Sequence, residues 1–143
     1  MAIPNPEPGL VISHTYLWHR EHRARRTEAR KARPCEIVLA MERESEIGTR
    51  VVVLPITHCP LDDPASAVEI PFSVKNHLGL DAERSWIVVS EGNEFLWPGY
   101  DLHKLSRTDR YDYGFLPPRF FDQVRDAFVR FYRAGTRRII PRG

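Results

Sequence analysis

The sequence predicts one small, mainly β domain in which short antiparallel strands form a strongly bent sheet or barrel, followed by a terminal helix. Three observations lead to this class. Five to seven short runs rich in β-branched and aromatic residues are separated by turn-forming residues. No helical patterns alternate with these runs, which argues against a parallel, doubly wound sheet. One amphipathic segment lies near the end of the chain, and 143 residues suit a single domain spanning 1–143.

The predicted elements follow in chain order. Three prolines within residues 1–8 indicate an irregular N-terminal arm. Pro34 favours an extended conformation at Arg33 and fixes where the second strand begins. A short helical turn is expected between Pro71 and Gly79. The runs predicted as strands are residues 9–18, 35–41, 50–56, 67–70, 85–90 and 94–97.

The terminal helix has the clearest pattern in the chain. Pro117 and Pro118 suit a helix start, and Gly135 suits its C-terminal end. Between them, apolar residues recur at helical spacing: Phe120, Phe121, Val124, Ala127, Phe128 and Phe131. Charged residues occupy the other face, so the helix is expected to cover the sheet. Residues 136–143 are expected to form a loose tail.

Positive charge is concentrated in one segment. Residues 1–35 hold seven basic and three acidic residues, whereas residues 36–143 hold 14 basic and 16 acidic ones. Most of this excess lies in residues 19–32, which have no apolar face and connect two predicted strands. The segment is therefore predicted to be a protruding loop or short surface helix that faces an anionic partner.

Two polar residues mark the ends of neighbouring predicted strands. Arg33 precedes the run that begins at Cys35, and Thr57 ends the run Val51–Val52–Val53–Leu54–Pro55–Ile56. If these strands pair, the guanidinium and the hydroxyl converge at one end of the sheet. Beside a cationic loop, such a pair indicates chemistry on a phosphodiester.

The order of these features resembles the MazF/PemK family of toxin ribonucleases from toxin–antitoxin pairs. The resemblance covers residues 9–134. Its pieces are the opening strand 9–18, Arg33–Pro34 with Ile37–Val38–Leu39, residues 52–57, Gly79–Leu80 with Ser85–Trp86–Ile87–Val88, and Tyr113–Gly114 with Leu116 before the last helix. The chain departs from the family pattern at Leu10, where members usually carry an acidic residue, and in its longer, more basic loop before Arg33.

The resemblance implies a fold, an activity and partners. The fold would be a small SH3-like antiparallel barrel of five to seven strands that forms a homodimer. The activity would be cleavage of single-stranded RNA without a metal, blocked by an acidic antitoxin protein. The family's catalytic arginine and threonine fall on Arg33 and Thr57, and Glu91 falls where members often carry a polar residue that faces RNA.

RNA cleavage by its own 2′-hydroxyl defines what the site must supply. Arg33 can neutralise charge on the phosphate with two donors, but its high pKa makes it a poor proton carrier. Thr57 can donate to a phosphate oxygen or orient the hydroxyl. His58 is the nearest candidate for proton transfer. Because neighbours on a strand face opposite sides, His58 joins Thr57 only if the chain turns there.

The expected RNA-binding surface is the basic segment together with Glu91. Its members are Arg20, Arg23, Arg25, Arg26, Arg30 and Lys31. The alternatives are that these charges serve solubility or dock the antitoxin. Trp18, Trp86 and Trp97 could stack on bases, but they are expected to be core or interface aromatics.

Other classes are weighed against the ribonuclease. The alternatives are a non-catalytic barrel toxin that binds a protein target and a basic nucleic-acid-binding module. Cys35 and Cys59 are expected to be free thiols, and no side chains have the spacing of a metal site, so no metal or cofactor is predicted. Neither a signal peptide nor a membrane-spanning run is visible, so a cytoplasmic protein is expected.

Overall fold

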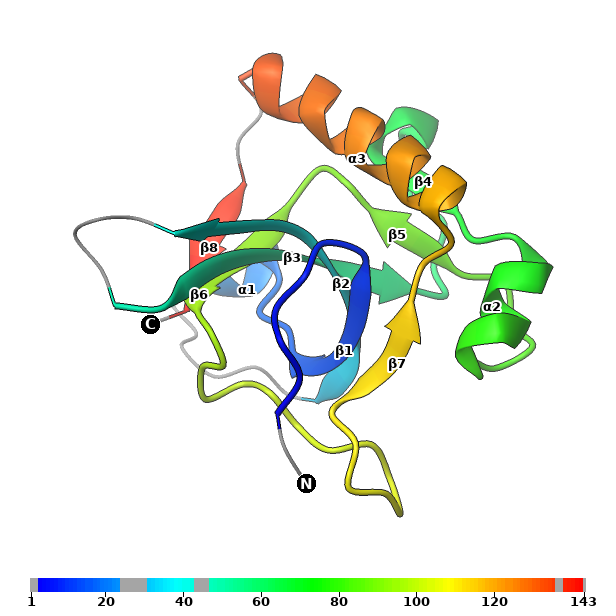
Figure 1. The fold of residues 1–143 in the computed structure, drawn as a ribbon. Helices are drawn as coiled ribbons and strands as arrows, with labels where there is room; N and C mark the ends of the chain where they lie inside the picture. Colours follow the sequence, from blue (N-terminus) through cyan, green and yellow to red (C-terminus); the bar gives the residue numbers. More distant parts are fainter. Residues whose placement is uncertain (1–2, 24–30, 43–46, 136–137, 143) are drawn as a thin grey trace.

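The computed structural model describes residues 3–23, 31–42, 47–135 and 138–142 (Figure 1). Its elements, in chain order, are β1 (Leu10–Thr15), α1 (His19–Arg23), β2 (Ala32–Glu42), β3 (Thr49–Thr57), η1 (Pro64–Ser66), β4 (Ala67–Glu69), α2 (Phe72–Leu78), β5 (Trp86–Val88), β6 (Gly92–Leu96), β7 (Asp112–Phe115), α3 (Pro118–Arg133) and β8 (Ile139–Pro141). The predicted mainly antiparallel fold with a C-terminal helix is confirmed.

The strands form one sheet in the order β4-β5-β3-β2-β1-β7. β3 is its central strand, because Arg50–Val53 pair with β6 while Ile56–Thr57 pair with β5. The sheet curls around the centre of the molecule (Figure 1). Within the described residues the two end strands of this order, β4 and β7, do not pair with each other. The sheet is therefore strongly bent but is not a closed barrel.

Two of the eight strands were not among the runs predicted as strands. β7 pairs with β1 and leads into α3. β8 lies in the tail that was expected to be loose, and it adds to β6 as the parallel pair of the sheet. Ile140 is buried there, and Arg142 forms a buried ion pair with Asp101. The expectation of a loose tail is thus wrong for residues 139–142, because long-range contacts hold them.

Apolar side chains fill both faces of the central strands. On one face, Val11, Leu54 and Ile87 pack with residues of α2 and α3. On the other, Ile12, Ile37 and Phe95 belong to a second cluster. This explains why the runs in β1, β2 and β3 are almost continuously apolar, since strands covered on both faces lack an alternating pattern.

The two longer helices end as their sequences indicate. α3 has proline at its first turn and buries Phe120, Val124, Ala127 and Phe128, the predicted apolar face. Gly135 follows its C-cap with φ of 81°, a conformation that favours glycine. α2 matches the predicted helical turn over residues 72–78 and is capped by left-handed Gly79.

Polar groups at the end of β1 are buried and tied to distant segments. The Asn93 side chain accepts a hydrogen bond from the Leu17 backbone N–H at 2.9 Å and donates one to the Leu17 carbonyl at 2.8 Å. His14 lies 3.3 Å from Asn93 and stacks on Phe95. Burial lowers the pKa of His14 to about 4, so its ring is neutral in the folded protein at neutral pH.

Glu36 is a second unusual buried group. Its side chain is fully buried, and neither carboxyl oxygen has a hydrogen-bond partner among the described residues. Burial raises the pKa of Glu36 well above its usual value, so the side chain is held as a neutral acid.

The buried ion pair predicts a large loss of stability on removal of one partner. Arg142 donates to Asp101 from Nε at 2.8 Å and from Nη2 at 3.1 Å, and Thr15 also donates to Asp101. We expect Asp101→Ala to lower the free energy of unfolding by about 3–5 kcal/mol, because Arg142 is left buried without this carboxylate. Urea denaturation of the two chains measures this loss in the free energy of unfolding. Asp126→Ala, on the exposed face of α3, should change the free energy by less than about 0.5 kcal/mol. Similar small losses in both variants would contradict this role.

The buried imidazole predicts a loss of stability in acid. Between pH 6.5 and about 4 the unfolded chain protonates His14 while the folded chain does not, so lowering the pH favours unfolding. Two units correspond to about 2–3 kcal/mol. Glu36 has the opposite effect in this range, because only the unfolded chain ionises it. We therefore expect that lowering the pH from 6.5 to 4.5 reduces the free energy of unfolding of the unaltered chain, relative to that of His14→Gln, by about 2–3 kcal/mol. Urea denaturation measures this free energy at each pH. If its dependence on pH is the same in the unaltered chain and in His14→Gln, the lowered pKa of His14 is refuted.

Candidate functional site

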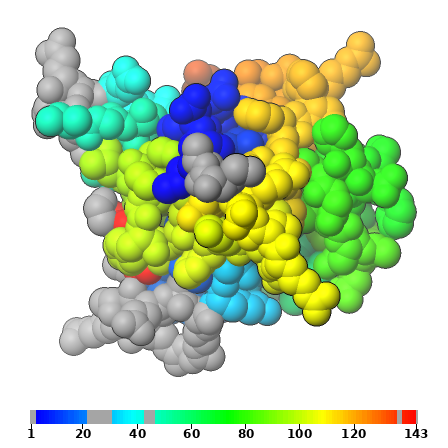
Figure 2. Space-filling model, turned by 60° about the horizontal axis from the view of Figure 1, so that its bottom comes forward, coloured from blue at the N-terminus to red at the C-terminus, as the bar shows by residue number. Residues whose placement is uncertain are grey.

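The ends of β2 and β3 bring Arg33 and Thr57 into one pocket. Cys35 pairs with Pro55, and continuing this register by two residues places Arg33 opposite Thr57. The pocket has a volume of about 190 Å³. It is lined by Lys31, Ala32, Arg33, Pro34, Ile56, Thr57, His58, Lys75, Leu80, Asp81 and Ser85. Figure 2 shows the first residues of β2 (light blue) at the surface, on the same face as α2 and the segment that follows it (green).

Arg33 is held by an aromatic ring rather than by a carboxylate. Its Cζ lies 5.0 Å from the centre of the Trp18 ring, a cation–π arrangement. Its Nε is buried without a hydrogen-bond partner, and among the described residues no carboxylate forms an ion pair with it. The guanidinium therefore keeps its charge available for an anion at the pocket.

Thr57 is the last residue of β3 and is almost buried. Its Oγ1 accepts a hydrogen bond from the backbone N–H of Cys59 at 3.1 Å, which leaves the hydroxyl proton free to be donated. The chain bends at this point, so His58 leaves the strand and lines the same pocket. The structure thus supplies the turn that Thr57 and His58 need in order to converge.

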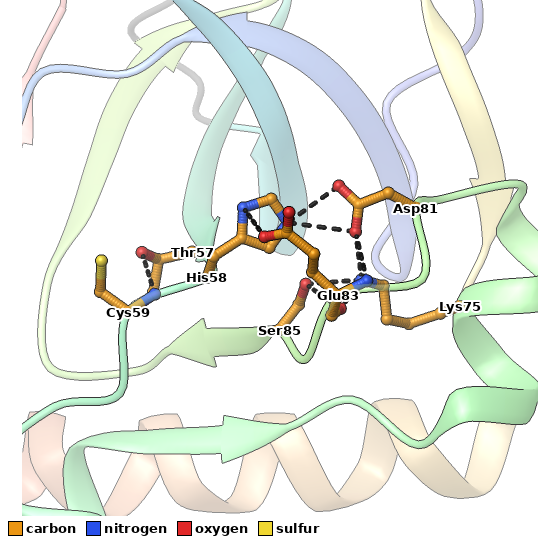
Figure 3. A network of polar contacts seen from close by, with 7 residues as sticks. All are labelled: Thr57, His58, Cys59, Lys75, Asp81, Glu83 and Ser85. Atoms are coloured by element: carbon orange, nitrogen blue, oxygen red, sulfur yellow. Dashed lines mark hydrogen bonds and ion pairs between the residues drawn. The ribbon is translucent and has the colours of Figure 1, made fainter.

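His58 lies in a network of charged side chains (Figure 3). Its Nε2 is 2.9 Å from Oδ2 of Asp81, and its Nδ1 is 3.5 Å from Oε2 of Glu83. Lys75 approaches Asp81 from the other side, with Nζ 2.7 Å from Oδ1. The hydrogen bond from Lys75 is the main cause that lowers the pKa of Asp81, so this group is a carboxylate.

Lys75 and Asp81 were missed from the sequence. Lys75 belongs to α2, and its side chain is only 3% exposed. Its Nζ donates to Asp81, to Ser85 Oγ at 2.7 Å and to the Glu83 carbonyl. One available signal was the spacing of three residues between Lys75 and Leu78, which places the lysine on the apolar face of a short helix.

The expected RNA-binding residues are only partly within the described chain. Arg20 stacks on Trp18 with its Cζ 5.1 Å from the ring centre. Arg20, Lys31 and Arg33 help to line a second cavity of about 230 Å³ beside the first, together with Tyr16, Trp18 and Glu21. Arg23 ends α1, and only its backbone is described. Arg25, Arg26 and Arg30 lie outside the described residues.

Glu91 has local partners in the structure. Its Oε1 accepts hydrogen bonds from the Tyr16 hydroxyl at 3.0 Å and from the backbone N–H of His19 at 2.9 Å. These contacts tie the start of α1 to the loop before β6. Glu91 therefore shapes the wall near Trp18 and does not line the pocket that holds Arg33 and Thr57.

Other features bear on the class of site. Both cysteines are free, Cys35 in the core and Cys59 at the surface. In the part of the chain that the structure describes, no three metal-binding side chains are grouped together. Within the same residues, no helix has the length and apolar character needed to cross a bilayer.

Comparisons with protein-family models, with curated proteins and with solved structures give no match for this chain.

Proposed function

We propose that this protein is an endoribonuclease that cleaves single-stranded RNA, without a metal, at the pocket between β2, β3 and α2. One observation carries the proposal: Arg33, which has no carboxylate partner among the described residues, shares a small pocket with Thr57 and His58. The resemblance to the MazF/PemK toxins in the order of motifs gives the same assignment of Arg33 and Thr57.

Each of the three side chains has a task in the reaction. Arg33 donates to the non-bridging phosphate oxygens and stabilises the negative charge that grows on them. Thr57 donates its hydroxyl proton to the phosphate or positions the 2′-hydroxyl. His58 takes the proton of that hydroxyl, which neither of the other two can do well at neutral pH.

The bonds and protons balance without a co-reactant. The ribose 2′-oxygen loses its proton to His58 and forms a bond to phosphorus, while the bond from phosphorus to the 5′-oxygen breaks. The leaving oxygen takes up one proton from solvent or from the protonated imidazole. The products are one RNA end with a 2′,3′-cyclic phosphate and one with a 5′-hydroxyl.

The surroundings of the pocket favour a single strand. Lys31 and Arg20 extend the positive charge from Arg33 into the second cavity, where they can contact neighbouring phosphates. A volume of about 190 Å³ suits one phosphate with its ribose, not a stacked duplex. In-line attack also requires the ribose to leave its helical geometry, which is easier in single-stranded RNA.

The cellular part of the proposal rests on the family resemblance. The enzyme would act in the cytoplasm as the toxin of a type II toxin–antitoxin pair, inhibit growth by cutting RNA, and be blocked by an acidic antitoxin. It would act as a homodimer. A small acidic protein encoded next to this chain, able to abolish cleavage when mixed with it, would support this role.

The decisive test is cleavage of labelled single-stranded RNA in EDTA. We expect the unaltered chain to cleave and Arg33→Ala to lower kcat/KM by about 10²–10³-fold, because a donor to the developing charge is lost. Thr57→Ala should lower it by at least about tenfold. Arg119→Ala, an exposed arginine on α3, is the matched control and should cleave normally.

Three outcomes would count against the proposal. Cleavage by Arg33→Ala at the normal rate would point to a contaminating nuclease. RNA binding without cleavage, present only at low salt, would favour the nucleic-acid-binding module. Growth inhibition that survives both Arg33→Ala and Thr57→Ala would favour a toxin that acts by binding a protein target.

A further inference from the structure

The carboxylate of Asp81 is held in one orientation by its neighbours. Oδ1 accepts hydrogen bonds from Lys75 Nζ at 2.7 Å and from the Glu83 backbone N–H at 3.1 Å. Oδ2 is thereby directed to His58 Nε2 at 2.9 Å (Figure 3). Oδ1 also lies 3.1 Å from His58 Nε2, so both oxygens face the imidazole, and Oδ1 is also held by Lys75 and the Glu83 N–H.

Lys75 is the fixed point of this arrangement. Its ammonium group is buried in the wall of the pocket, and its three donors are all used, by Asp81, by Ser85 Oγ and by the Glu83 carbonyl. Loss of any of these partners would leave one N–H of a buried ammonium without an acceptor, at substantial cost. The side chain therefore stays in place and holds Asp81 in its orientation.

The orientation of Asp81 decides which nitrogen of His58 carries the proton. A carboxylate can only accept hydrogen bonds, so neutral His58 places its single proton on Nε2. The lone pair is then on Nδ1. Nδ1 lies 3.5 Å from Oε2 of Glu83, whose side chain is 73% exposed and free to turn toward solvent.

We propose that Lys75 and Asp81 are positioning residues that hold His58 with its proton on Nε2, so that Nδ1 accepts the proton of the RNA 2′-hydroxyl. This inference rests on the ribonuclease function proposed above and specifies how its proton acceptor is prepared. As the 2′-oxygen bonds to phosphorus, its proton moves to Nδ1 and the imidazolium charge is balanced by Asp81. The bond to the 5′-oxygen breaks as described above.

A purely structural role explains less of the geometry. Asp81 and His58 are 55% and 49% exposed, and exposed ion pairs add little to stability. Arg84 and Glu69 already form an exposed bidentate pair in the same region. The alignment of a buried lysine, a carboxylate and an imidazole along one pocket wall is what proton transfer at that pocket requires.

The substitution Asp81→Asn tests the proposal because it should move the proton of neutral His58 from one ring nitrogen to the other. Lys75 and the Glu83 N–H are donors, so the amide oxygen must keep the place of Oδ1. The amide nitrogen then takes the place of Oδ2, where it donates to His58 Nε2. Neutral His58 should therefore move its proton to Nδ1, which can no longer act as the base. The substitution does not change the volume of the side chain, since aspartate and asparagine have the same shape.

Two measurements are made on the full-length chain. ¹⁵N NMR of the histidine rings should place the proton of neutral His58 on Nε2 in the unaltered chain and on Nδ1 in Asp81→Asn. RNA cleavage in EDTA should fall by about 10²-fold or more in this variant, the usual contribution of an acid–base group. Because Lys75 loses its counterion in this variant, the thermal midpoint is measured for both chains and cleavage is assayed at a temperature well below both midpoints. Asp122→Asn, on the exposed face of α3, is the control and should change neither measurement.

A double variant separates positioning from folding. If Asp81 acts through His58, the variant with both His58→Ala and Asp81→Asn should cleave as slowly as His58→Ala alone, because the effects are not additive. Additive losses would overturn the proposal, as would an unchanged proton position or normal cleavage in Asp81→Asn while Arg33→Ala is inactive. If the unaltered chain does not cleave RNA at all, the ribonuclease function fails and this inference fails with it.

Discussion

The pairing of β2 with β3 determines both the centre of the fold and the composition of the pocket. Near the hairpin, Glu42 pairs with Thr49, whereas beyond the irregularity between Ile37 and Leu39 the register changes by one residue. Continued without that change, the hairpin register would place Arg33 opposite His58. The register beyond the bulge, in which Cys35 pairs with Pro55, instead extrapolates to Arg33 opposite Thr57. Since a shift of one residue exchanges the two faces of a strand, this single extra residue decides which residue of β3 lies on the same face as Arg33 at this end of the sheet.

The pocket combines elements that are distant in sequence and differ in rigidity. Arg33 and Thr57 are on strands whose neighbours are buried on both faces, so their positions are set by the core. Asp81 and Glu83 are on the exposed segment after α2, which the buried Lys75, the His58 side chain and the pair of Arg84 with Glu69 hold in place. In the proposed reaction, charge neutralisation by Arg33 would depend on the packing of the strands, whereas proton transfer at His58 would depend on polar contacts at the surface.

The sequence predicted those parts of the structure that depend on local patterns. The apolar runs of β1, β2 and β3, the turn at α2 and the periodicity of α3 are set by neighbouring residues, and each was found within a few positions. The convergence of Arg33 and Thr57 followed from the pairing of adjacent strands. β8 was missed because Ile140 and Arg142 are ordered by partners some 40 residues or more away. Lys75 was missed for a similar reason, since its acceptors follow α2 in a segment without periodicity.

Glu36 gives the folded protein a preference for mildly acidic solution. Above the ordinary pKa of a glutamate, the unfolded chain gains by ionising a carboxyl group that the core keeps protonated, until the pH reaches the raised pKa of the folded state. Raising the pH through this range therefore favours unfolding. Methionine has a similar length and no charge to hydrate, so replacing this one buried acid with it would remove this dependence on pH without altering any side chain that lines the pocket.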